Sequence, residues 1–189
     1  MRNVVLTGIS RGLGRCLFQE LSALGDVRLF ALGRNFPEQT QNITAIFVPC
    51  DLSRSDDLPV LSDVIPMEGD VIFINNAGTV EPIGEIGVLD IEILHRAVQV
   101  NFVSPMGLCN QLVHLCRKNG QRLKVIDIST GAADYPIVGW SAYCSTKAAI
   151  KMFLDVLTEQ GKIRGDVQVL HVDPGVMDTD MQKYIRASS

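Results

Sequence analysis

The sequence of 189 residues predicts a single α/β domain with a Rossmann-type, doubly wound parallel sheet in three α/β/α layers. Two observations lead to this fold class. Short runs rich in β-branched residues alternate with longer helical patterns, which indicates βαβ units. Most of the strand runs are almost continuously apolar, as expected for strands that helices cover on both faces. No repeat, linker or low-complexity segment divides residues 1–189, so we expect one domain.

The predicted elements follow in regular order. Six strands are expected at residues 3–7, 28–32, 45–49, 70–75, 124–129 and 167–172. Four helices are expected at residues 12–24, 53–64, 87–118 and 141–161. The connection 35–42 is short and contains Pro37, so the crossover helix expected there is abbreviated or absent.

The predicted helix at 87–118 is apolar on nearly all sides. Such a helix is buried, and in a small domain another subunit often supplies part of the cover. We therefore expect a homodimer or homotetramer. Coverage of the helix by its own sheet is the alternative.

The composition is that of an ordinary globular protein, with 47% hydrophobic and 20% charged residues. The net charge of −4 gives no electrostatic reason to expect nucleic acid or an anionic membrane as partner. The chain opens directly on a strand-like run, and no apolar stretch reaches the roughly 18 residues of a membrane span. The five cysteines have no CxxC spacing, so they predict reduced thiols, no metal site and a cytoplasmic location.

A glycine-rich turn follows the first strand and leads into the first helix. Glycines at this place permit a tight turn and let backbone N–H groups approach a pyrophosphate at the helix N-terminus. The spacing is G-x-x-x-G-x-G rather than G-x-G-x-x-G, and a tight connection without a ligand is the alternative. The cofactor-binding residues expected in this turn are Gly8, Ser10, Arg11, Gly12, Leu13 and Gly14.

The end of the second strand indicates which dinucleotide binds. NAD sites usually place an acidic residue there, to accept hydrogen bonds from the ribose 2′-hydroxyl. Here the strand ends on Arg34, and Arg11 should reach the same region. Two guanidinium groups suit a 2′-phosphate through forked, charge-assisted hydrogen bonds, which predicts NADP(H). Two solvated surface arginines are the alternative.

A series of short motifs spans nearly the whole chain. They are Thr7-Gly8-x-x-x-Gly12-x-Gly14, Asp51-Leu52, Asn75-Asn76-Ala77-Gly78, Asn101, Tyr143-x-x-x-Lys147 and Pro174-Gly175. In these motifs and in their order the sequence resembles the short-chain dehydrogenase/reductase family. Residues 139–144 (GWSAYC) and 174–182 (PGVMDTDMQ) resemble, more narrowly, the sepiapterin reductase and benzil reductase branch of that family.

The resemblance implies further cofactor contacts. Asp51 and Leu52 should flank the adenine, although Asp51 could instead cap a helix that begins near Ser53. Val176 and Thr179 should hold the nicotinamide carboxamide. Asn76, Ala77 and Gly78 should lie along the cofactor, with Pro174 and Gly175 near its nicotinamide end; the Asn-Ala-Gly run could also be a simple turn.

Tyr143 and Lys147 are four residues apart on a predicted helix, so both side chains project from one face. A free tyrosine has a pKa of about 10, and a nearby ammonium favours the phenolate and lowers that pKa. The phenol could then donate its proton to a carbonyl oxygen as general acid. In the family the lysine also binds the nicotinamide ribose.

Three more polar residues are expected at the catalytic site. The family places a serine 13 residues before the tyrosine, where this chain has Thr130. Thr130 keeps a hydroxyl for the substrate carbonyl, and the neighbouring Ser129 is the alternative. Asn101 matches an asparagine that supports a water-linked proton path from the lysine; a polar break inside an apolar helix is its other interpretation.

The sequence thus predicts an NADPH-dependent carbonyl reductase acting on a small ketone, diketone or pterin-type carbonyl. A non-catalytic NADP(H)-binding sensor or a truncated pseudo-enzyme is the alternative. The family usually continues for several dozen residues beyond the point that matches Ser189, which supply a substrate lid and a last strand. We therefore expect either a truncated or incomplete tail, or another subunit that covers the strand at 167–172.

Overall fold

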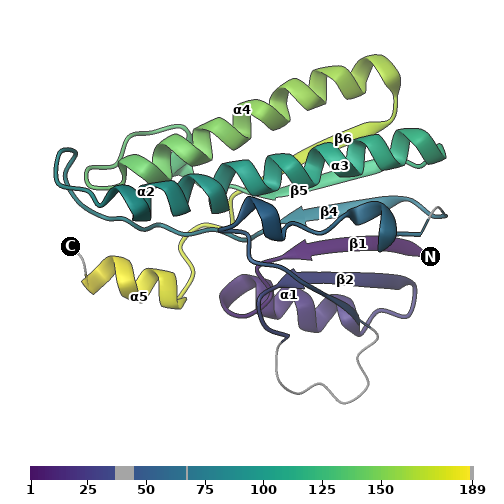
Figure 1. The fold of residues 1–189 in the computed structure, drawn as a ribbon, viewed down its shortest axis with the longest axis horizontal. Coiled ribbons are helices and arrows are strands. Elements are labelled where there is room, and N and C mark those ends of the chain that lie inside the picture. Colours follow the sequence, from purple (N-terminus) through teal and green to yellow (C-terminus); the bar gives the residue numbers. More distant parts are fainter. Residues whose placement is uncertain (37–44, 67, 188–189) are drawn as a thin grey trace.

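The computed structural model describes residues 1–36, 45–66 and 68–187. Its centre is a six-stranded parallel sheet with the strand order β3-β2-β1-β4-β5-β6 (Figure 1). This order is that of a doubly wound sheet, so the predicted Rossmann-type fold class is confirmed. The strands are β1 (Arg2–Thr7), β2 (Val27–Gly33), β3 (Ala45–Pro49), β4 (Val71–Asn75), β5 (Leu123–Ile128) and β6 (Val167–Val172).

Helices pack on both faces of the sheet. On one face α1 (Gly12–Ser22) packs through Phe18 against alternate residues of β1 and β2. On the other face α3 (Ser104–Asn119) and α4 (Ser141–Arg164) cover the opposite set of strand residues and enclose the larger core cluster (Figure 1). Because successive side chains of a strand point to opposite faces, one sheet supplies both cores.

The prediction of a helix at residues 53–64 is wrong. Two single 3₁₀ turns, Ser55–Asp57 and Leu61–Asp63, occupy this segment. Pro59 lies between them, and the residue before it, Leu58, is extended with φ −72° and ψ 131°. Proline disfavours the helical conformation of the preceding residue and has no N–H to donate, so a continuous helix cannot form.

The helix predicted at 87–118 is present but divided. α2 (Ile91–Val98) begins after Asp90, whose carboxylate accepts from the N–H groups of Glu92 and Ile93 at 2.8 and 3.1 Å. A π-helical stretch, Gln99–Val103, joins α2 to α3. Such stretches are rare and frequently found at functional sites.

Two further segments complete the comparison with the predicted elements: one helix that was not predicted, and one predicted connection that lies mostly outside the described residues. The chain forms an additional short helix, α5 (Asp180–Ala187), which the sequence patterns did not predict. The expected abbreviated crossover at 35–42 falls mostly on residues 37–44, outside the described residues. Among the helices of the described part, none is long and apolar enough to cross a membrane.

Candidate active site

A cavity of ≈ 650 Å³ opens where the carboxyl ends of the strands meet the loops that follow them. Crevices at this edge of a doubly wound sheet are where such folds bind ligands. Its lining includes most residues predicted for the site: Gly8, Ser10, Arg11, Gly12, Leu13, Gly14, Arg34, Asp51, Leu52, Asn76, Ala77, Gly78, Ser129, Thr130, Tyr143, Lys147, Pro174, Gly175 and Thr179. Asn101 and Val176 are outside this lining.

The turn after β1 requires its glycines. Gly8 has φ +75°, and a Cβ there would lie 2.7 Å from Asn76 Nδ2. A Cβ on Gly14 would overlap the carbonyl oxygen of Gly8. The turn therefore folds back on itself so tightly that only a residue without a side chain fits at these two positions.

The N-terminus of α1 presents unsatisfied backbone N–H groups to this cavity. Arg11 is its N-cap residue and makes no side-chain capping hydrogen bond, and the first turn holds no acidic residue. The first N–H groups of a helix have no partner within the helix and attract anions. This edge of the cavity thus has the donors and the open approach that a pyrophosphate needs.

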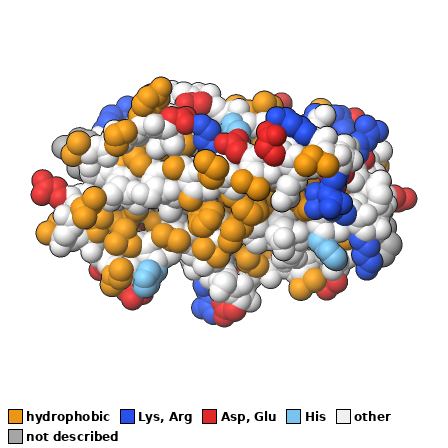
Figure 2. All heavy atoms as spheres, turned by 90° about the horizontal axis from the view of Figure 1, so that it is seen from above, with side chains coloured by type: hydrophobic (Ala, Val, Ile, Leu, Met, Phe, Trp, Pro, Cys, Tyr) orange, Lys and Arg blue, Asp and Glu red, His pale blue; other side chains and the backbone are white. Residues whose placement is uncertain are grey.

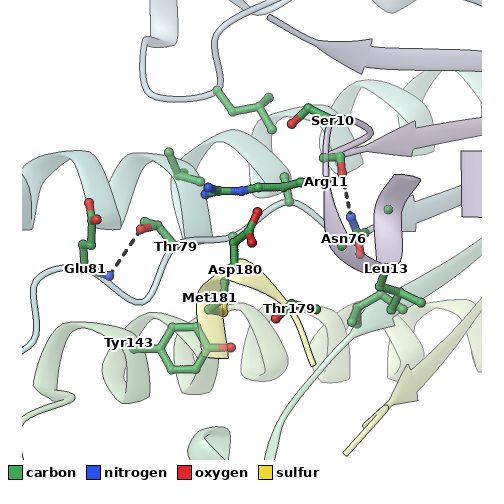
Figure 3. A pocket seen from close by; sticks show the side chains of 18 of the residues that line it. Ser10, Arg11, Leu13, Asn76, Thr79, Glu81, Tyr143, Thr179, Asp180 and Met181 are labelled. Carbon is green, nitrogen blue, oxygen red and sulfur yellow. Dashed lines mark hydrogen bonds between the residues drawn. The ribbon is translucent and has the colours of Figure 1, made fainter. Parts of the chain in front are cut away.

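The loop after β4 is bound firmly to the glycine turn. Thr7 Oγ1 accepts from the backbone N–H groups of Asn76 and Ala77, both at 3.1 Å. Asn76 Nδ2 in turn donates to the carbonyl oxygens of Thr7 at 3.0 Å and Gly8 at 3.1 Å (Figure 3). Residues far apart in sequence therefore form one rigid wall of the cavity.

Arg34 and Asp51 lie at the end of the cavity formed by β2 and β3. Asp51 Oδ1 accepts from Ser53, from the backbone N at 2.9 Å and the hydroxyl at 2.8 Å. Burial would raise the pKa of Asp51, but these bonds and the charges of Arg34 and Arg54 hold it below its ordinary value. Asp51 therefore caps a local turn and also faces the cavity. Arg11 and Arg34 are exposed, and the Arg11 side chain extends over the cavity (Figure 3).

Tyr143 lies at the other end of the cavity, on the first turn of α4. It is 9% exposed and belongs to a small buried cluster with Val80 and Ala132. The ring of Trp140 lies edge-on to it, with 5.8 Å between the ring centroids. Burial raises the pKa of Tyr143 to about 12, while hydrogen bonding with the Thr130 side chain opposes this rise.

Lys147 lies one turn further along α4 and is buried. Its Nζ donates to the backbone oxygen of Ile128 at 2.9 Å and lies 5.9 Å from the centroid of the Tyr143 ring. We expected this ammonium to lower the pKa of Tyr143. That expectation is wrong for the protein alone, because burial outweighs the opposing influences and the phenol keeps its proton more tightly.

Thr130 and Ser129 both line the cavity, but they differ in their relation to Tyr143. Thr130 Oγ1 accepts from the backbone N of Ala132 at 3.3 Å, and the same side chain contacts the phenol. Its hydroxyl proton can therefore point toward the cavity. This geometry favours Thr130 over Ser129 as the hydroxyl beside Tyr143.

Asn101 lies within the π-helical stretch and is 2% exposed. Its Nδ2 donates to the Thr79 carbonyl oxygen at 2.8 Å and to Thr146 Oγ1 at 3.1 Å. Its Oδ1 accepts from the Thr79 backbone N at 2.8 Å. The Asn101 side chain thus links the loop after β4 to α4, behind the cavity wall. Val176 also stands apart from the cavity lining, with 87% of its surface exposed.

The sequence patterns missed part of the cavity wall. Met181 and Ile185 of α5 pack against the cluster around Tyr143 and line the cavity. Met181 lies beside Tyr143 (Figure 3). One signal was available: Thr179 and Gln182 have the spacing of a capping box, and Thr179 Oγ1 accepts from the Gln182 backbone N at 3.4 Å. Other lining residues that were not predicted include Thr79, Glu81, Ile93, Arg96, Trp140, Asp173, Met177 and Asp180. The described residues hold no group of acidic, cysteine or histidine side chains fit to bind a metal ion.

Residues 2–189 match the family described as short chain dehydrogenase. A benzil reductase ((S)-benzoin forming) of Bacillus cereus is 32% identical over 201 residues, which cover 100% of this chain and 81% of that protein. The sepiapterin reductase of Bos taurus is 32% identical and covers 98% of this chain and 76% of its own. A short-chain dehydrogenase/reductase structure from Burkholderia vietnamiensis superposes with a TM-score of 0.81 at 27% identity, covering 98% of this chain and 90% of that one.

Proposed function

The chain belongs to the short chain dehydrogenase family of oxidoreductases, and on that premise we propose that it is an NADPH-dependent reductase of small carbonyl compounds. One observation carries the proposal. Tyr143, Thr130 and Lys147 come together at one end of the cavity, and the glycine turn lines its other end. A cavity with dinucleotide-binding geometry at one end and a proton donor at the other suits hydride transfer to a carbonyl group.

Enzymes of this family use nicotinamide cofactors, and the residues present here fit such a group. The unsatisfied N–H groups at α1, with Gly8, Ser10, Gly12, Leu13 and Gly14, would hold the pyrophosphate. Further contacts are proposed for Asp51 and Leu52 at the adenine, Asn76, Ala77 and Gly78 along the middle, and Pro174, Gly175, Val176 and Thr179 at the nicotinamide. For Val176 this role requires a change of position, since it is exposed and away from the lining.

The choice of NADP(H) over NAD(H) rests on Arg11 and Arg34. Arg34 directly follows β2, and both arginines line the cavity with exposed side chains. A ribose 2′-phosphate is a dianion that forked guanidinium donors bind well, while an acidic residue at the end of β2 would repel it. Both arginines therefore favour the phosphorylated cofactor.

The bound nicotinamide supplies the hydride, and the protein supplies the proton. Tyr143 keeps its phenolic proton at neutral pH, since an ordinary phenol ionises only near pH 10 and burial raises the pKa of Tyr143 further, to about 12, so it is a donor rather than a base. It would transfer this proton to the substrate carbonyl oxygen as negative charge develops there. Thr130 would hold that oxygen by a hydrogen bond, with Ser129 as the alternative, and Lys147 would hold the cofactor ribose.

The substrate class is proposed from the wall around Tyr143. Trp140, Met181 and Ile185 form an apolar surface next to the phenol. Such a surface suits aromatic ketones and diketones or a pterin side-chain carbonyl, and the named substrates of the benzil and sepiapterin reductases fall in these classes. A small ketone, a diketone or a pterin-type carbonyl is therefore the proposed substrate.

A homodimer or homotetramer is also proposed. Hydrophobic side chains are spread over the face that α4 covers (Figure 2), and exposed apolar residues on α2 and α4 include Ile91, Met152 and Val156. A second copy of the chain would bury them. A reducing, cytoplasmic location is also proposed, because the five cysteines have no CxxC spacing.

The test is loss of NADPH absorbance with a panel of diketones, aromatic ketones and pterins. Tyr143→Phe should lower turnover by at least about 100-fold, because a positioned general acid contributes that much, while NADPH binding by fluorescence stays intact. NADPH binding without turnover on any carbonyl compound would instead support a non-catalytic sensor. No binding of either dinucleotide would overturn the proposal.

A further inference from the structure

A buried carboxylate lies beneath the cavity, in the middle of a row of polar side chains across three strands. Asp127 of β5 is fully buried, and its neighbours in the parallel register are Asn75 of β4 and His171 of β6. Residues in register on adjacent strands point to the same face of the sheet. All three therefore face the layer of α3 and α4. Phe73, Val125 and Val169, two positions earlier on the same strands, pack into the core on this face.

Both oxygens of this carboxylate are held by side chains. Asn75 Nδ2 donates to Asp127 Oδ1 at 2.8 Å, and His171 Nδ1 lies 3.0 Å from Asp127 Oδ2. Because an ionised carboxylate can only accept, this contact assigns the donor role to His171 Nδ1. On its other side, His171 Nε2 lies 3.3 Å from Asp155 Oδ1 of α4. The row thus reaches from the sheet interior to the surface.

The buried ammonium of Lys147 faces the same region. Its Nζ donates to the backbone oxygen of Ile128, the residue next to Asp127. Burial lowers the pKa of Lys147, and the charge of Asp127 opposes this by raising it. An ammonium taken out of water needs a compensating charge nearby, since an isolated buried ion costs several kcal/mol.

We propose that Asp127 is the electrostatic partner of Lys147, a positioning residue that acts on the reaction through the lysine, and that Asn75 and His171 hold its carboxylate in place. The link to the reaction rests on the proposed function, whereas the pairing of the two charges does not. The ionisable groups around Asp127 are Lys147 and Tyr143 of α4, His171 of β6 and Cys109 of α3, and Asp155 faces His171 from α4.

The pairing is tested by urea unfolding of Asp127→Asn, Lys147→Met and the double variant. In the parent, Asp127→Asn leaves a buried ammonium without its partner and should lower the urea midpoint. In the Lys147→Met background Asp127 has already lost the ammonium and keeps only Asn75 and His171, so the same change should lower the midpoint by less. Equal shifts in both backgrounds would overturn the pairing, whether or not the protein turns over any substrate.

A second measurement covers the case in which Asp127→Asn does not fold. Lys147→Met alone leaves the buried carboxylate without the nearby ammonium and should lower the urea midpoint. The matched control is Lys151→Met on the same helix, whose partner Asp134 is 49% exposed and whose loss should change the midpoint much less. Equal midpoints for Lys147→Met and Lys151→Met would overturn the proposal.

The reaction link is tested by the pH profile of Asp127→Asn. Without the carboxylate, Lys147 loses its proton at lower pH, so the alkaline decline of kcat should move to lower pH. KM for the carbonyl compound should stay unchanged, because Asp127 does not line the cavity. An unmoved alkaline limb, in a protein that otherwise turns over, would show that Asp127 has only a structural role.

Discussion

Lys147 Nζ lies 5.9 Å from the centroid of the Tyr143 ring and donates its hydrogen bond to the Ile128 backbone oxygen at 2.9 Å. The ammonium therefore faces the ring and the end of β5. Burial raises the pKa of the phenol to about 12, so Tyr143 is fully protonated near neutral pH. A protonated phenol is the form required for reduction of a carbonyl group.

The raised pKa of Tyr143 predicts a pH-dependent loss of stability. The unfolded phenol ionises near its ordinary pKa of 10, whereas the folded one resists ionisation until about 12. The unfolded state thus binds fewer protons between pH 10 and 12, and the free energy of unfolding falls across this window, by on the order of 2 kcal/mol.

Tyr143→Phe should remove this contribution, so its urea midpoint should decline less than that of the parent between pH 10 and 12. Tyr135→Phe is the control, because Tyr135 is 73% exposed. A decline in Tyr143→Phe equal to that of the parent would contradict the pKa assignment.

The two hydroxyls beside the phenol can be separated by substitution. Thr130→Val keeps the shape of the side chain and removes the hydroxyl that contacts Tyr143, so turnover should fall by about 100-fold. Ser129→Ala should change kcat only slightly. Steady-state kinetics with one diketone checks both, and the reverse pattern would transfer the role to Ser129.

Arg34→Asp should alter the choice of cofactor. The change replaces a donor for the ribose 2′-phosphate with a carboxylate that repels it and suits a 2′-hydroxyl. The ratio of kcat/KM for NADPH over NADH should fall at least about tenfold. Arg54→Asp is the control, since Arg54 pairs with Asp56 at 2.9 Å and is outside the cavity lining. An Arg34→Asp protein with unchanged preference for NADPH would refute the assignment.

Gly14→Ala should damage the glycine turn. The added methyl would overlap the Gly8 carbonyl oxygen, so the turn must open, at a cost of about 1–3 kcal/mol in the free energy of unfolding. The affinity for NADPH should fall with it. Gly25→Ala is the matched control, because a Cβ there meets nothing within 4 Å. Thermal unfolding and fluorescence titration measure the two effects, and equal behaviour of both variants would show that the turn tolerates a side chain.

The sequence by itself determined the sheet. Strands β1, β2 and β4 are almost wholly buried, so their apolar runs stand out from the polar segments between them. The bounds of all six strands deviate by no more than one residue from the expectation. It also determined the family and many, though not all, of the residues that line the cavity, because the glycine turn and the Tyr143–Lys147 spacing are local patterns. The roles of those residues remain predictions.

Two of the predicted helices differ from the structure. The apolar periodicity at residues 53–64 predicted a helix, but no continuous helix forms there because Pro59 interrupts the backbone hydrogen bonding. The helix at 87–118 contains a π-helical stretch around Asn101, whose side chain bonds Thr79 and Thr146. These partners lie 22 and 45 residues away, beyond the reach of any local pattern.

Only the tertiary structure decided the electrostatics of the site. Desolvation depends on everything packed around a group, so the pKa of Tyr143 rises although a lysine lies one turn away. The pairing of Asp127 with Asn75 and His171 exists because three strands align in register, and sequence spacing does not reveal register between strands. The sequence thus shows which residue types are available for the chemistry. Their charge and proton affinity depend on burial and on neighbours that only folding brings together.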